Sequence, residues 1–217
     1  MPFLTCALAV NKKTNCINTG CVVRYLKKWF TAFVIVGLVS ACETVVEPKQ
    51  FSELRYTHLP AISLAVAGIE VINKYQPSTK KPNVETEFPV SPAIVASNWL
   101  RDRLSAVGGS DVVQATVTKA SVLEVPLKRS SGIRGAFTND QSERYDATLA
   151  LRIDILDFRG NLLGTVSSEA KRSQTVSEDL SLAEREQIWF RMVEAMMNDL
   201  NGSLEKQVRH HFSRWLR

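Results

Sequence analysis

Apolar residues recur at every second position over residues 144–158, which is the clearest pattern in the chain. The polar residues Asp146, Thr148, Arg152 and Asp154 lie at alternate positions between them. This alternation predicts a β-strand with one buried and one solvated face, as in an antiparallel sheet that is covered on one side. The buried face is expected to consist of Tyr145, Ala147, Leu149, Leu151, Ile153 and Ile155. A tight turn at Gly160 and an apolar-containing segment at residues 162–175 predict the second strand of a hairpin.

A helical period begins near residue 181. Ser181 and Glu184 have the spacing of a capping box, which satisfies the free amides at a helix start. Apolar residues then follow at intervals of three and four, and we expect this stripe to lie across the apolar face of the sheet. The stripe consists of Trp189, Met192, Val193, Met196, Leu200, Leu204, Val208, Phe212 and Trp215.

Weaker patterns precede these two elements. Residues 60–73 predict a strand whose apolar alternation changes parity at Gly68, which indicates a β-bulge. Residues 91–107 predict a helix that begins with Ser91 and Pro92 and stops at the following glycine pair. Residues 111–127 predict another strand, with Val113, Ala115 and Val117 alternating and then Leu123, Val125 and Leu127.

Together these elements predict an α+β fold in the order β-α-β-β-β-α. We expect a single antiparallel or mixed sheet of about four strands, packed against two helices. The fold is assigned to a single domain at residues 53–217, with residues 42–52 forming a polar tether before it.

The first 41 residues are expected to be a leader rather than part of this fold. From Arg24 a short basic segment precedes an apolar run, and small residues then lead to Cys42. This order is that of a secretory signal peptide. The uncharged stretch at residues 29–41 has 13 residues, fewer than the roughly 20 of a membrane-spanning helix.

The net charge and the cysteines are also divided between the leader and the domain. The net charge of +5 lies entirely in the leader, since 22 basic and 22 acidic residues remain after Cys42. The domain therefore lacks the basic excess of a nucleic-acid-binding surface. All four cysteines lie at or before Cys42, which excludes disulfides, thiolate metal sites and catalytic thiols beyond it.

No catalytic, cofactor-binding or metal-binding set is evident in the domain. His58 has no activating neighbour, and His210 and His211 are adjacent on a helix end, where they point about 100° apart. Asp154 and Asp157 have opposite parity on one strand. Two segments are candidates for binding instead: the connection at residues 128–143, which contains SSGIRG and Phe137, and the basic, aromatic C-terminal segment VRHHFSRWLR.

The sequence VSAC at residues 39–42 resembles the bacterial lipobox. This resemblance implies lipidation of the Cys42 thiol with acyl chains such as palmitate, and signal cleavage between Ala41 and Cys42. Several acyl chains on one residue would give durable attachment, because one chain anchors a protein only marginally. A secreted protein and an uncleaved membrane anchor are the alternatives.

With the stretches RYDATLALRIDILD and SLAEREQIWFRMVEAMMNDLNGSLEKQV, the chain resembles uncharacterised bacterial envelope lipoproteins. It is more distantly similar to the auxiliary lipoproteins of ABC-type transporters and to lipopolysaccharide-assembly lipoproteins. The resemblance implies a non-enzymatic accessory that faces the periplasm and binds a membrane protein or lipid. A lipid-anchored hydrolase and a structural lipoprotein without a ligand are the alternatives.

Two details of the leader bear on processing and location. Residues 1–21 are long and polar for a signal peptide, so we expect translation to start near Val22 or Val23. Glu43 follows Cys42 in place of the aspartate that retains some lipoproteins in the inner membrane, which favours the outer membrane.

The lipobox interpretation predicts the fate of a Cys42→Ser variant. Without the thiol there is no nucleophile to carry the lipid, so the precursor stays unlipidated and uncleaved at Ala41–Cys42. Radiolabelled palmitate incorporation and the mass of the N-terminal peptide test this. A Ser52→Ala variant, outside the VSAC motif, is the control and matures normally, whereas normal maturation of Cys42→Ser contradicts the prediction.

Overall fold

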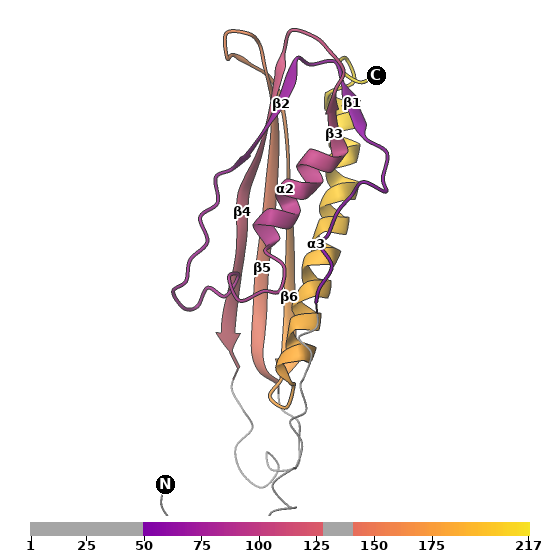
Figure 1. The fold of residues 1–217 in the computed structure, drawn as a ribbon. Helices are drawn as coiled ribbons and strands as arrows, with labels where there is room; N and C mark the ends of the chain where they lie inside the picture. Colours follow the sequence, from indigo (N-terminus) through magenta and orange to yellow (C-terminus); the bar gives the residue numbers. More distant parts are fainter. Residues whose placement is uncertain (1–49, 128–140) are drawn as a thin grey trace, which may run out of the picture. The chain divides into compact units, whose positions relative to one another are not determined.

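The fold was analysed in a computed structural model that describes residues 50–127 and 141–217, all within one compact unit, Lys49–Arg217. Ala41, Cys42 and the leader lie outside the described residues, as does the tether up to residue 49. In chain order the elements are β1 (Ile62–Leu64), β2 (Gly68–Asn73), α2 (Pro92–Arg103), β3 (Leu104–Ala106), β4 (Val112–Pro126), β5 (Gln141–Leu156), β6 (Leu162–Ser177) and α3 (Leu182–His211) (Figure 1).

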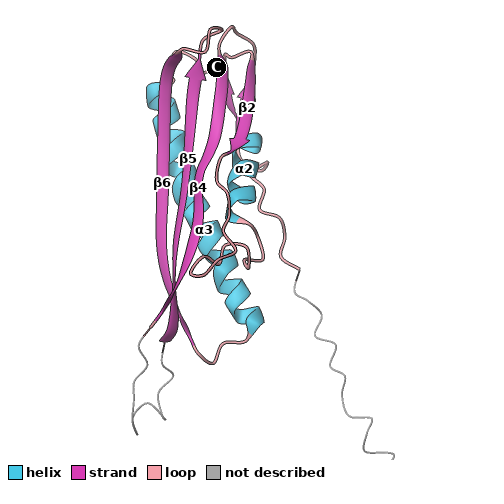
Figure 2. Cartoon of the chain, turned by 90° about the vertical axis from the view of Figure 1, so that its left-hand side faces the viewer, coloured by secondary structure: helices cyan, strands magenta, loops and turns pink. Residues whose placement is uncertain are grey.

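A four-stranded sheet with the order β2-β4-β5-β6 forms one layer. β2 runs parallel to β4, while β4, β5 and β6 are antiparallel neighbours. Both helices lie on the same face of this sheet (Figure 2). The alternate residues of β5 from Tyr145 to Ile155 are buried on that face. The predicted α+β class, the mixed sheet and the two-helix layer are confirmed.

The long helix α3 begins as predicted. The Ser181 hydroxyl accepts a hydrogen bond from the Glu184 amide, and the Glu184 carboxylate accepts one from the Ser181 amide at 2.9 Å. All nine residues of the predicted stripe, from Trp189 to Trp215, are buried. Within the described ranges, no helix combines the length and apolar character needed to cross a membrane.

The prediction of one bulged strand at residues 60–73 is wrong. The segment forms two strands in two sheets: β1 pairs in parallel with β3, and β2 pairs in parallel with β4. The partner strands β3 and β4 are separated at the same level. There the Val107 amide donates to Leu64 O and the Ala67 amide donates to Asp111 O. The parity change at Gly68 therefore marks a crossing from one sheet to the other.

The helix predicted to reach Val107 ends at Arg103. Its start at Ser91 and Pro92 is confirmed, although the Ser91 side chain makes no capping hydrogen bond. The next three residues form β3, because parallel pairing with β1 gives their backbone groups hydrogen-bond partners. A further helical turn would remove this pairing. Val107 is 52% exposed and does not contribute to the helical apolar face.

In β4 the predicted strand is confirmed, but its alternation changes partway. The register with β5 shifts between Val117 and Lys119, so one residue is extra on β4. Ala120 and Val122 are therefore buried beyond this point, whereas Leu123 is 37% exposed.

The backbone at Gly109, between β3 and β4, passes close to the backbone at Ala65, and two glycine substitutions test this close approach. Gly109 has φ +154°, and a Cβ there would lie 2.4 Å from Ala65 O, whereas a Cβ at the helical Gly202 meets nothing within 4 Å. We expect Gly109→Ala to lower the free energy of unfolding by at least about 2 kcal/mol. Gly202→Ala is expected to raise it by about 0.5–1 kcal/mol.

Urea unfolding followed by tryptophan fluorescence measures both variants. Equal effects of the same sign would contradict the assignment of Gly109 to a close backbone crossing.

Candidate interaction site at the β5–β6 turn

The turn between β5 and β6 is fixed by Asp157. Its carbonyl accepts from the Gly160 amide at 2.9 Å, and its carboxylate accepts from the Arg159 and Asn161 amides at 2.8 Å each. Gly160 has φ +84°, which favours glycine there and confirms the predicted turn. Hydrogen bonds, first from the Asn161 side chain and then from the amides, lower the pKa of Asp157.

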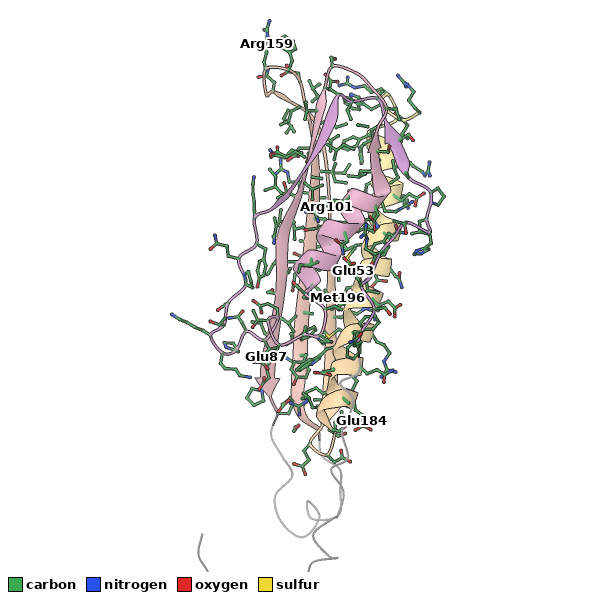
Figure 3. The ribbon with its side chains drawn as sticks, in the orientation of Figure 1. Glu53, Glu87, Arg101, Arg159, Glu184 and Met196 are labelled. Carbon is green, nitrogen blue, oxygen red and sulfur yellow. The ribbon has the colours of Figure 1, made fainter. Side chains whose placement is uncertain are left out.

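This rigid turn presents apolar side chains to solvent. Phe158 is 77% exposed, Leu162 52% and Leu163 39%. They make up three of the seven large apolar residues that are exposed in the described part of the chain. The Arg159 guanidinium lies 5.0 Å from the centre of the Phe158 ring. We call Phe158, Arg159, Leu162 and Leu163 the tip, and Figure 3 shows Arg159 at one end of the domain and Glu184 at the other.

A local irregularity places the two leucines of the tip. Leu156 pairs with Leu162, but Ile155 pairs with Gly164, so Leu163 is an extra residue on β6. Such a bulge breaks the alternation that would turn one of two consecutive side chains inward. An exposed apolar cluster held on a fixed turn is typical of a binding surface.

The C-terminal segment predicted as a binding candidate has a different role. Phe212 and Trp215 are buried, and the Trp215 indole donates a hydrogen bond to Asp111. A Cβ at Gly164 would lie 3.1 Å from the Phe212 ring, so these aromatic residues support the base of the tip. They are not available to a ligand, which corrects the prediction for this half of the segment. Its arginines remain at the surface, and Arg214 stacks on the Trp215 ring.

The other predicted chemical candidates do not converge. His58 is exposed, and the exposed His210 and His211 contact one another at the end of α3. Asp154 accepts hydrogen bonds from Arg152, away from the turn that Asp157 caps. Among the described residues there is no group of three or more side chains that could hold a metal ion. Residues 128–140, with SSGIRG and Phe137, lie outside the described residues.

Two buried charged side chains in the described part of the domain, Glu85 and Arg103, make structural contacts. Glu85 is 3% exposed and accepts hydrogen bonds from the Tyr75 hydroxyl at 2.6 Å and the Ser78 amide at 2.8 Å. Arg103 is 2% exposed and donates to Asn201 and Glu205, which joins α2 to α3. These contacts hold loops and helices in place.

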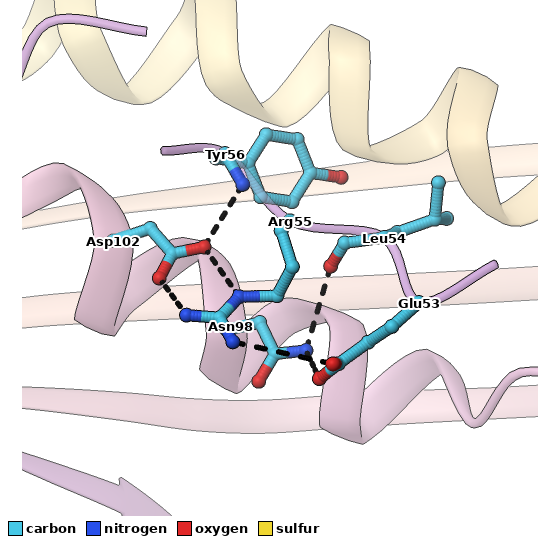
Figure 4. Close-up of polar contacts among 6 residues, drawn as sticks. All are labelled: Glu53, Leu54, Arg55, Tyr56, Asn98 and Asp102. Carbon is cyan, nitrogen blue, oxygen red and sulfur yellow. Dashed lines mark hydrogen bonds and ion pairs between the residues drawn. The ribbon is translucent and has the colours of Figure 1, made fainter. Parts of the chain in front are cut away.

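The segment that leads into the domain is fastened to both helices. Arg55 donates two hydrogen bonds to the Asp102 carboxylate, which also accepts from the Tyr56 amide at 2.9 Å (Figure 4). The Asn98 side chain donates to Glu53, also on this segment, at 2.8 Å. Further upstream, at the end of the predicted tether, the Phe51 ring lies 5.3 Å from that of Phe190 on α3.

No family model matches this chain, and neither does any curated protein. Bacterial lipoproteins are among the solved structures to which it is similar. A minor lipoprotein from Acinetobacter baumannii has 16% identity and a TM-score of 0.34, covering 67% of this chain and 92% of that one. Rare lipoprotein B from Shewanella oneidensis has 12% identity and a TM-score of 0.34, covering 65% and 93% respectively.

A lipoprotein from Neisseria meningitidis has 17% identity and a TM-score of 0.21, covering 66% of this chain and all of that one. Similarities of this size leave the function to be inferred from the residues of the chain itself.

The Asp102 contacts predict a stability effect that depends on pH. Its side chain is 4% exposed, and hydrogen bonds from Arg55 lower its pKa against the opposing effect of burial. Because this carboxyl has a lower pKa in the folded state, its contribution is present above the unfolded pKa, near 4, and is lost as the pH falls through the folded value. At pH 7 we expect Asp102→Asn to lower the free energy of unfolding by about 1–3 kcal/mol.

Urea titrations at pH 7 and pH 3 measure this effect, and the difference from wild type is expected to shrink at the lower pH. Glu194→Gln, at an exposed position on α3, is the matched control and changes the free energy of unfolding by less than about 0.5 kcal/mol. An Asp102→Asn effect that is equal at both pH values would contradict the prediction.

Proposed function

We propose that this chain is a lipid-anchored lipoprotein of the bacterial envelope that acts as a non-enzymatic accessory in transport or assembly. In this proposal it binds an envelope protein through the tip. The observation that carries the proposal is the exposed apolar cluster on a turn that Asp157 holds rigid. A preorganised apolar surface loses little conformational entropy on binding, which favours a protein contact there.

The sequence supports the anchoring part of the proposal. The leader, the VSAC motif and Cys42 stand in the order that lipoprotein processing requires. Glu43 supports the outer membrane as the location, with the domain on the periplasmic side.

The arrangement of the domain supports the accessory role. α3 has 30 residues, and Phe51 contacts it at Phe190, while Phe212 packs at the base of the tip. At about 1.5 Å per residue, roughly 33 Å of helix separate these two contacts. The tip thus lies well away from the point where the described chain begins, which suits contact with a second protein.

A photocrosslinker at position 158 tests this proposal in cells that make the full chain. We expect the probe at Phe158 to give one discrete protein adduct. Leu182 is the matched control, because it is 67% exposed and lies at the far end of β6 from the tip. A probe at Leu182 should give no such adduct.

A charged substitution at the tip is the second test of this proposal. Phe158→Asp should reduce the amount of copurified partner at least about tenfold, while thermal stability changes little because Phe158 is 77% exposed. Equal adducts at both positions, or adducts with phospholipid alone at position 158, would overturn the proposal.

A further inference from the structure

The long helix α3 crosses the face of the sheet obliquely. Figure 2 shows its C-terminal half beside β6 and its first turns away from β6. Where the two elements are close, the Ser168 hydroxyl donates to that of Ser203 at 2.8 Å, and Arg172 donates to Asp199 at 2.9 Å. Beyond these contacts, toward the start of α3, the seam between β6 and α3 opens into a hollow of about 340 Å³.

The hollow has an apolar floor and a cationic rim. Met192 is 5% exposed and forms the floor together with Ile188 and Ala195, which are half-buried. Arg172 of β6 and Arg191 of α3 line the rim and are exposed. The aliphatic part of an arginine side chain extends an apolar surface, while its guanidinium group stays in water. No carboxylate is among the described residues that line the hollow.

The charges around the hollow leave one cation uncompensated. Arg172 is paired with Asp199, whereas Arg191 forms no ion pair or hydrogen bond with a described residue. The three side chains together carry a net charge of +1, from two arginines and one aspartate. Guanidinium groups bind carboxylates through two parallel N–H donors. A ligand with one negative charge therefore matches the hollow, whereas a dianion would leave a negative charge without a partner.

The walls of the hollow are held in place by the core. On β6, Arg172 pairs in register with Ala147 and Gln174 with Tyr145, both buried residues of β5. On α3, Met192 belongs to the buried stripe. Such fixed walls need little ordering when a ligand binds. Small-molecule sites have volumes from about 300 Å³ upward and combine apolar walls with a few polar groups that fix orientation, and the hollow has these properties.

We propose that the hollow between β6 and α3 binds an amphiphilic carboxylate with a single alkyl chain. Arg191 holds the carboxylate, Arg172 supplies the second guanidinium, and the alkyl chain lies on the apolar floor. The site is separate from the tip, because roughly 25 Å of helix lie between Ala195 and Phe212 at the base of the tip. The proposal does not depend on the partner proposed for the tip.

Octanoate is the probe that tests this site. It is titrated into the full-length protein in phosphatidylcholine nanodiscs, and NMR of its carbon-13-labelled carboxylate follows binding, with empty nanodiscs as the blank. We expect saturable binding. The dissociation constant should fall at least about threefold for each two methylene groups added between butyrate and octanoate. Octylammonium and octanol, which lack the anionic group, should bind at least about tenfold more weakly.

Two variants separate the charge of the site from its floor. Arg191→Gln removes the uncompensated guanidinium and should raise the dissociation constant of octanoate about tenfold or more. Ala195→Leu keeps both arginines but fills the floor, and should raise the constant by a similar factor. Arg101→Gln is the matched control, since it makes the same change at an exposed position on α2, and should leave the constant unchanged. Thermal melts verify that each variant is folded.

The outcomes that would overturn the proposal are distinct. Wild type that shows no saturable octanoate binding, or Arg191→Gln that binds as tightly as wild type, would overturn the site. Equal affinity for octylammonium would overturn the role of the arginines. Tighter binding of octyl phosphate than of octanoate would overturn the choice of a carboxylate, and Ala195→Leu without effect would overturn the position of the alkyl chain.

Discussion

The contact between the apolar stripe of α3 and the buried face of the sheet is the interaction on which the rest of the structure depends. Near one end of the helix, Trp189 stacks on Phe88 of the long loop and meets Tyr145 of β5 edge-on, with ring centroids 4.8 and 5.3 Å apart. At the other end Phe212 and Trp215 close the core beneath the β5–β6 turn. Each such side chain contributes about 1.5–3 kcal/mol by leaving water. One helix thus fixes the loop, the central strand and the base of the tip.

Local sequence patterns predicted the elements whose contacts are repetitive. β5 could be predicted because its alternation from Tyr145 to Ile155 is unbroken, and α3 because its capping box and stripe agree. The split of residues 60–73 between two sheets could not be predicted in this way, since it depends on pairing with residues about 40 positions later in the chain. β3 escaped prediction for the same reason: its residues continue a helical apolar pattern, and only the pairing with β1 makes them a strand.

The candidate site shows the same limit. The signals for the turn, an aspartate followed three residues later by a glycine, are local and readable at Asp157 and Gly160. The exposure of Leu162 and Leu163 depends on the bulge against β5, and the burial of Phe212 and Trp215 depends on their long-range contact with Gly164 and Asp111. Sequence reasoning therefore assigned binding to the C-terminal aromatic residues, which the fold uses as support.

The fastening of residues Glu53–Tyr56 has a mechanical consequence. Any tension on the chain ahead of Gln50 reaches the domain first at Phe51, which contacts Phe190 on α3, and then through the Asn98 contacts and the Arg55–Asp102 pair on α2. α2 spans Pro92–Arg103, and Arg103 joins it to α3 through Asn201 and Glu205. Load would therefore pass from the incoming segment into the helical layer, where several side-chain contacts share it, and would not peel β1 away from its sheet one hydrogen bond at a time.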